Sequence, residues 1–96
     1  MSEESIVKKR SLMLATQEIE RIGTLLNLPK PVKDEAAVIF KEALEKGLLK
    51  GRSVESVVAA SVYIACRKLR VPILFDEIMK YFNVKDGELK GAYKAL

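Results

Sequence analysis

The residues of this 96-residue chain that are best suited to bind a ligand are four consecutive ones, Lys50, Gly51, Arg52 and Ser53. Glycine lets the backbone pass close to a phosphate, and the flanking lysine and arginine can donate charge-assisted hydrogen bonds to it. Ser53 is a good N-cap, and the free amides of a helix N-terminus favour an anion. These residues predict a phosphate-binding corner. The alternative is that Gly51 only ends a turn and that Arg52 is solvated.

A second basic group follows at Arg67, Lys68 and Arg70, which we expect to add phosphate contacts. The alternative is structural, because basic residues at the end of a helix also complement its dipole. Between Lys41 and Arg70 there are seven basic residues against three acidic ones, and this difference accounts for the whole net charge of +4. A local basic surface allows a nucleic-acid partner without requiring one.

Enzyme chemistry finds little support in the composition. The chain has no histidine and a single cysteine, Cys66, which excludes an internal disulfide, a Cys/His zinc site and catalysis through a Ser–His or Cys–His pair. Cys66 lies in an apolar run, so we expect it in the core. We therefore expect no enzyme, no catalytic residue, no cofactor and no metal. No segment is long and apolar enough to cross a membrane, and a reducing interior suits the lone thiol.

The element that must position these residues is a helix from Ser53 to Leu69. Its middle, from Val57 to Cys66, contains no charged residue. A helix that is apolar all round lies either in a membrane or at the centre of a core, and this one is too short to span a bilayer. We therefore expect a central helix with neighbours on several sides.

Apolar residues recur at helical spacing in other segments, which predicts four more helices. After a flexible tail over residues 1–9, the first helix is expected to begin behind Ser11, and the second is expected to run from Pro31 to a left-handed C-cap at Gly47. The predicted buried residues are Ala15, Ile19, Ile22 and Leu26 in the first helix; Val32, Ala36, Ile39 and Ala43, with Phe40 beside them, in the second; Ile78, Met79 and Phe82 in a short fourth helix over residues 76–82; and Leu89, Tyr93 and Leu96 in a fifth that starts near Glu88. The sequence predicts an all-α domain of five helices with a buried central third helix.

The run LKGRSVESVVAASVYIACR, residues 49–67, closely resembles the first cyclin-like repeat of archaeal transcription factor B and of its eukaryotic counterpart, transcription factor IIB. The resemblance extends over about residues 10–96, which implies one cyclin-like repeat with a short or truncated fifth helix. In this family two such repeats follow a zinc ribbon. This chain has no zinc-ribbon cysteines and no room for a second repeat, so it resembles an isolated first repeat, from a dissected factor or a short paralogue, including one carried by a mobile element.

The resemblance implies a role in transcription initiation. The family's core clamps the TATA-binding protein on bent promoter DNA and recruits RNA polymerase, so these three are the implied partners. The loop that matches Gly51 and Arg52 touches DNA just downstream of the TATA element, in or beside the minor groove. The implied location is the cytoplasm of an archaeal cell, on the nucleoid, with no membrane partner.

Two departures from the family pattern weaken the expected DNA contact. The family usually has Pro-Arg-Thr where this chain has Pro72-Ile73-Leu74, and it tends to place basic residues where Asp86, Gly87 and Gly91 stand. Fewer phosphate contacts should weaken DNA binding and flatten its salt dependence.

The first of these departures leaves an apolar run, Ile73-Leu74-Phe75, which is either a helix-packing seam or an exposed protein-binding patch. The second functional hypothesis is therefore a stand-alone cyclin-box module with reduced DNA contact that binds the polymerase, another protein or itself.

Overall fold

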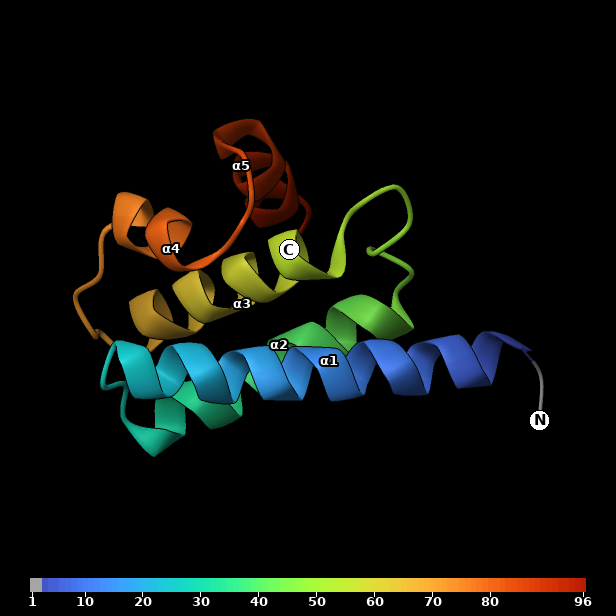
Figure 1. Cartoon of the computed structure of the whole chain (residues 1–96), viewed down its shortest axis with the longest axis horizontal. Helices are drawn as coiled ribbons and strands as arrows, with labels where there is room; N and C mark the ends of the chain where they lie inside the picture. Colours follow the sequence, from blue (N-terminus) through green and yellow to red (C-terminus); the bar gives the residue numbers. More distant parts are fainter. Residues whose placement is uncertain (1–2) are drawn as a thin grey trace.

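Five helices make up the part of the chain that the computed structural model describes, residues 3–96, with side chains from residue 6 onward. They are α1 (Glu3–Leu25), α2 (Lys30–Glu45), α3 (Val54–Lys68), α4 (Phe75–Tyr81) and α5 (Asp86–Ala95). α1 and α2 lie along one side of α3, and α4 and α5 cover its other side (Figure 1). The all-α, five-helix prediction is confirmed.

α3 is the centre of the domain, as its charge-free sequence predicts. Every residue from Ser56 to Val62 is buried, so no face of this stretch is left to solvent. Two buried serines satisfy their hydroxyl groups within the helix: Ser61 Oγ donates to the Val57 carbonyl at 2.7 Å and Ser56 Oγ to the Ser53 carbonyl at 2.8 Å. Polar groups that are hydrogen-bonded in this way can be buried without a large desolvation penalty.

α1 begins earlier than the sequence pattern indicates, and the predicted start behind Ser11 is wrong. The helix is continuous from Glu3, and Ser11 faces the interior instead of capping. Residues 3–10 contain neither glycine nor proline, so a helix nucleated by packing further along extends through them at little cost. Met1 and Ser2 lie outside the described residues, and the flexibility of residues 1–9 stays a prediction.

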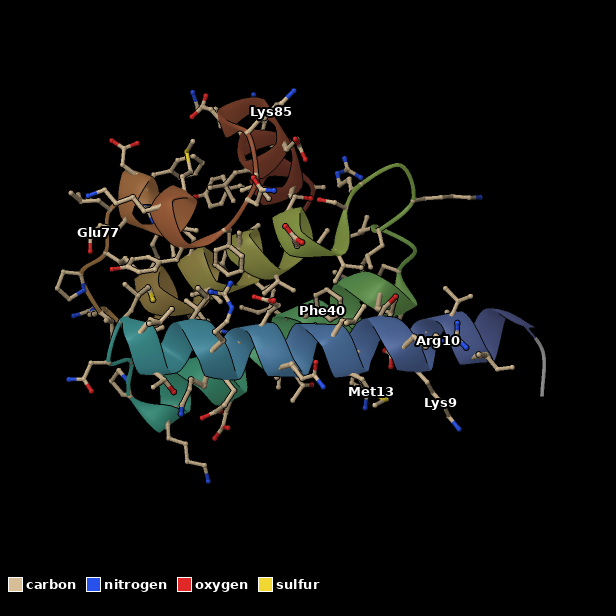
Figure 2. All side chains as sticks on the ribbon, in the orientation of Figure 1. Lys9, Arg10, Met13, Phe40, Glu77 and Lys85 are labelled. Atoms are coloured by element: carbon tan, nitrogen blue, oxygen red, sulfur yellow. The ribbon has the colours of Figure 1, made fainter. Side chains whose placement is uncertain are left out.

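The buried faces of the other helices match the predictions in part. In α2 the residues Val32, Ala36, Phe40 and Ala43 are buried, whereas Ile39 is only half-buried. Phe40 is fully enclosed and points into the interior, while Lys9 and Met13 project from the outer side of α1 (Figure 2). Among the largest enclosed side chains, Phe40 therefore anchors α2 to the core.

α4 and α5 differ from the predictions mainly at their ends. α4 covers residues 75–81, one residue earlier than predicted, and α5 starts at Asp86 instead of near Glu88. In α5, Leu89 and Ala92 are buried, but Tyr93 is 36% exposed, and so is Leu96, which directly follows the helix. Tyr93 lies on the flank of α5. The centroids of the Tyr93 and Tyr63 rings are 5.5 Å apart, and the two rings pack in a T-shaped arrangement.

Three helices end in the same way, with one residue in the left-handed conformation. The N–H of the following residue then bonds back to a carbonyl of the last turn, the hydrogen bond that closes a Schellman motif. The left-handed residues are Asn27, Gly47 and Arg70, and the closing bonds are Leu28 to Gly23 at 2.8 Å, Leu48 to Ala43 at 2.9 Å and Val71 to Cys66 at 2.8 Å. Only the left-handed conformation of Gly47 was predicted, because glycine is the residue type that most often adopts it at the end of a helix.

Candidate nucleic-acid interface

The loop between α2 and α3 turns sharply over Gly51. The Lys50 N–H donates to the Gly47 carbonyl at 3.3 Å, and the Arg52 N–H donates to the Leu49 carbonyl at 2.9 Å. Gly51 adopts a φ of 75°, and a Cβ added there would meet no atom within 4 Å. Glycine is therefore needed for the backbone conformation, and the space above it is open to an approaching ligand.

Ser53 caps α3, as predicted. Its Oγ accepts a hydrogen bond from the Ser56 N–H at 3.1 Å. The N–H groups of Val54 and Glu55 have no partner among the described residues, so they can receive an anion at the positive end of the helix dipole. The exposed Glu55 carboxylate lies in the same turn and reduces the local positive potential.

Two cations stand beside this helix start. The Arg52 guanidinium donates from Nη1 to the Leu48 carbonyl at 3.1 Å, which holds the exposed side chain against its own loop. Lys50 is exposed and forms no ion pair with the part of the chain that the structure describes. Because neither charge is neutralised by a carboxylate within hydrogen-bond distance in that part, both can be offered to a phosphate.

α5 faces this corner across a hollow of about 360 Å³. The hollow is lined by Gly51, Arg52, Ser53, Ser56, Gly87, Glu88 and Gly91. Neither Gly87 nor Gly91 has an atom within 4 Å of where its Cβ would stand, so packing does not require glycine at either position. The structure thus brings two of the departures from the family pattern opposite the predicted corner, and Glu88 adds a carboxylate there. No pattern in the sequence indicates that Gly87, Glu88 and Gly91 lie opposite this loop.

The second basic group lies at the other end of α3. The fifteen-residue helix separates the two groups by about 22 Å along its axis. Arg67 donates from Nη1 to Tyr63 Oη at 3.3 Å, and this hydrogen bond raises the arginine's pKa. Lys68 pairs with Glu35 at 2.9 Å, which likewise raises its pKa. Phosphate contacts by Arg67, Lys68 and Arg70 stay a prediction, but these residues form a surface separate from the loop corner.

The apolar run before α4 is divided between interior and surface. Ile73 and Phe75 are half-buried against the core. The centroids of the Phe75 and Tyr63 rings are 5.2 Å apart, and the two rings pack in a T-shaped arrangement. Leu74 is 67% exposed. Its N–H donates to Glu77 Oε1 at 3.2 Å, so Glu77 caps α4 in place of a hydroxyl residue. Two of the three side chains of the run thus pack against the core, and only Leu74 presents a large apolar surface to solvent. Binding of a protein at Leu74 stays a prediction.

Cys66 is enclosed in the core. Its burial raises the pKa of the thiol from 9.0 to about 11, which keeps it protonated and unreactive near neutral pH. Within the described residues, no three histidine, cysteine or acidic side chains are placed to hold a metal ion. None of the helices in the described part of the chain combines the length and the apolar character of a membrane span.

Comparison with known proteins gives consistent matches. Residues 8–96 match the family model described as the transcription factor TFIIB repeat. The chain is 53% identical over 87 residues to transcription initiation factor IIB of Saccharolobus shibatae, covering 91% of this chain and 28% of that protein. It is 48% identical over 86 residues to transcription initiation factor IIB of Pyrococcus horikoshii, covering 90% and 29% respectively. The chain thus spans less than a third of the length of these archaeal relatives and matches one repeat only.

Proposed function

The chain belongs to the transcription factor TFIIB repeat family, whose members are transcription factors and not enzymes, and from this premise we propose that it acts as a single core repeat at promoters. It contacts DNA through Lys50, Gly51, Arg52 and Ser53. The observation that carries the proposal is the exposed corner itself: a glycine in the left-handed conformation, two cations without ion-pair partners among the described residues, and open amides at the start of α3.

The position of α3 supports this role. Because the helix is buried on all sides from Ser56 to Val62, its N-terminus cannot move without disturbing the core. The corner is therefore held in place before DNA arrives, and less conformational entropy is lost on binding.

The TATA-binding protein and RNA polymerase, which the family resemblance implies, are the proposed protein partners. A single repeat that is assayed by itself lacks the avidity of a two-repeat core, so each contact of this chain should be weak in such an assay. Binding at promoters would place the chain on DNA in the cytoplasm of an archaeal cell.

A second function is favoured by the surface of α5. The wall of the hollow opposite Arg52 carries Glu88 and two glycines and no basic residue, so fewer phosphates can be held there. A cyclin-like module that binds a protein, the polymerase or a second copy, with reduced DNA contact, fits this surface and the exposed Leu74.

The test is a titration of the isotope-labelled chain with promoter DNA and the TATA-binding protein, read from the amide signals. Signals of Gly51, Arg52 and Ser53 should shift. The Lys50→Ala/Arg52→Ala variant should weaken DNA binding and lower the slope of log K against log salt by about two, since each phosphate contact contributes about 0.9. A Lys41→Ala/Lys80→Ala variant removes the same charge from exposed positions on α2 and α4 and is the control.

Amides of residues 51–53 that stay unmoved while others shift would show that the corner is not the site. If the chain binds no DNA but sediments as a dimer or associates with purified polymerase, the second function replaces the first. An Arg67→Ala/Lys68→Ala variant tests the separate basic surface in the same assay.

A further inference from the structure

The hollow between the start of α3 and the start of α5 carries opposite charges on its two walls. α5 packs on α3, and its first two turns stand beside the beginning of that helix (Figure 1). Arg52 is the charged residue that lines the α3 side, and Glu88 is the one that lines the α5 side. A volume of about 360 Å³ would hold about a dozen water molecules, so a group of another molecule fits between the two charges.

The Glu88 carboxylate is available to a ligand. Its side chain is exposed and forms no hydrogen bond or ion pair with the residues that the structure describes. Asp86, by contrast, pairs with Lys90 at 2.8 Å. The residues three and four positions after Glu88 are Gly91 and Ala92, which supply no cation to the same face of the helix.

Two glycines leave this carboxylate uncovered. Gly87 and Gly91 make up the rest of the α5 wall, and the place where each Cβ would stand is open space. Neither glycine has a positive φ, and glycine lowers the stability of a helix relative to alanine. The fold therefore gains nothing from them, whereas a molecule that approaches the backbone of α5 closely does.

The chemistry of a carboxylate limits what it can accept from DNA. An ionised carboxylate accepts hydrogen bonds and donates none. Beside DNA it is repelled by the phosphates, and covering it costs free energy unless a donor meets it. The donors that a duplex exposes are the exocyclic amino groups of its bases. A G·C pair exposes one in each groove, guanine N2 in the minor and cytosine N4 in the major, whereas an A·T pair exposes none in the minor groove.

We propose that Glu88 selects a G·C base pair where promoter DNA passes the hollow, by accepting a hydrogen bond from an exocyclic amino group of that pair. Arg52, on the opposite wall, holds the neighbouring phosphate. The inference rests on the proposed DNA contact of residues 50–53 and adds a specificity-determining residue to it. Phosphate contacts alone position a protein on DNA and carry no sequence information.

The probe is a promoter duplex that the TATA-binding protein holds in one register, with A·T flanks through which a single G·C pair is moved stepwise. Binding of the chain, followed by fluorescence anisotropy, should be about three- to tenfold tighter with the pair at one position, as expected for one hydrogen bond. At that position, hypoxanthine in place of guanine removes the minor-groove amino group, and pyrimidin-2-one in place of cytosine removes the major-groove one. One of these replacements should abolish the preference and thereby identify the groove.

Glu88→Ala should abolish the same preference. Glu55→Ala is the matched control, because Glu55 is also an exposed carboxylate in the first turn of a helix but does not line the hollow. Each variant removes one negative charge beside the DNA, so both should bind the duplex with uninterrupted A·T flanks more tightly than the original chain. Only Glu88→Ala should lose the preference for the G·C pair. Circular dichroism checks that both variants are folded.

Equal binding at every position of the G·C pair would overturn the inference while the DNA contact of residues 50–53 stands. So would a preference that survives both base replacements or Glu88→Ala, and so would one that Glu55→Ala removes as well. A chain that binds none of these duplexes overturns both proposals. Arg52→Ala separates them, since it should weaken binding to every duplex and leave the ratio between duplexes unchanged.

Discussion

The two left-handed glycines on either side of Leu49 offer a matched experiment on the loop. Gly47 has a φ of 72° and Gly51 a φ of 75°, and at both positions an added Cβ would meet no atom within 4 Å. Alanine at either position therefore meets only the backbone penalty of the left-handed conformation, which is roughly 1–2 kcal/mol for a residue with a Cβ. Gly47→Ala and Gly51→Ala should lower the free energy of unfolding by equal amounts.

This loss is small enough for both variants to remain folded. A domain of 96 residues is stable by about 5–14 kcal/mol. For a domain of this size a loss of 1–2 kcal/mol lowers Tm by roughly 4–16 °C. Urea and thermal unfolding followed by circular dichroism should therefore show two destabilised proteins whose free energies of unfolding agree within about 0.5 kcal/mol.

DNA binding should separate the two variants. Only Gly51 lies in the corner with Arg52 and Ser53, where a methyl group would stand in the path of a phosphate. Gly51→Ala should weaken promoter binding about five- to tenfold relative to Gly47→Ala, the equivalent of about 1–1.4 kcal/mol. If both variants bind DNA equally well, the corner is not the contact; if neither is destabilised, the left-handed conformations are absent.

Three further predictions concern stability. Gly91→Ala should raise the free energy of unfolding by about 0.5–1 kcal/mol, since Gly91 lies inside α5 with open space around it; an unchanged urea midpoint would contradict this. Arg70→Gly should add about 0.5–1 kcal/mol by relieving the left-handed arginine that ends α3, and a lower Tm would oppose this reasoning. Burial raises the pKa of Cys66 to about 11 from 9.0 in the unfolded chain, so the unfolded state loses its proton first, and the stabilisation that is complete below pH 9 is lost as pH rises toward 11. The thiol's contribution to the slope should be largest near pH 10, at about 1.1 kcal/mol per pH unit, and the slope should be smaller in Cys66→Ala; equal slopes would refute the assignment.

Local signals in the sequence were reliable where they depend on neighbouring residues alone. The charge-free run from Val57 to Cys66 predicted the central helix, Ser53 predicted its cap, and Gly47 predicted a left-handed helix end, and all three are confirmed. Each signal is decided within one or two helical turns: a hydroxyl caps an amide three residues on, and glycine is the residue that adopts positive φ without strain.

Periodicity was less reliable at the edges of helices. Phe40 is enclosed while Ile39 is not, and Ala92 is buried in place of Tyr93. Adjacent residues differ by about 100° around a helix, so a small rotation of the helix against its neighbours decides which of two apolar residues faces inward. Asn27 and Arg70 take the left-handed conformation because the chain must turn there to pack the next element, and neither residue type requires it.

The amino-acid sequence by itself thus determined the helical class, the buried central helix and the local geometry of the corner at residues 50–53 that is proposed to bind DNA, because charge, capping and glycine geometry act over a few residues. The tertiary structure alone decided that Gly87 and Gly91 face that corner, that Arg67 and Lys68 lie at the far end of α3, and that α1 passes beside the α2–α3 loop. These relations join residues up to about 40 positions apart, and they follow from the angles at which whole helices pack, which no local pattern encodes.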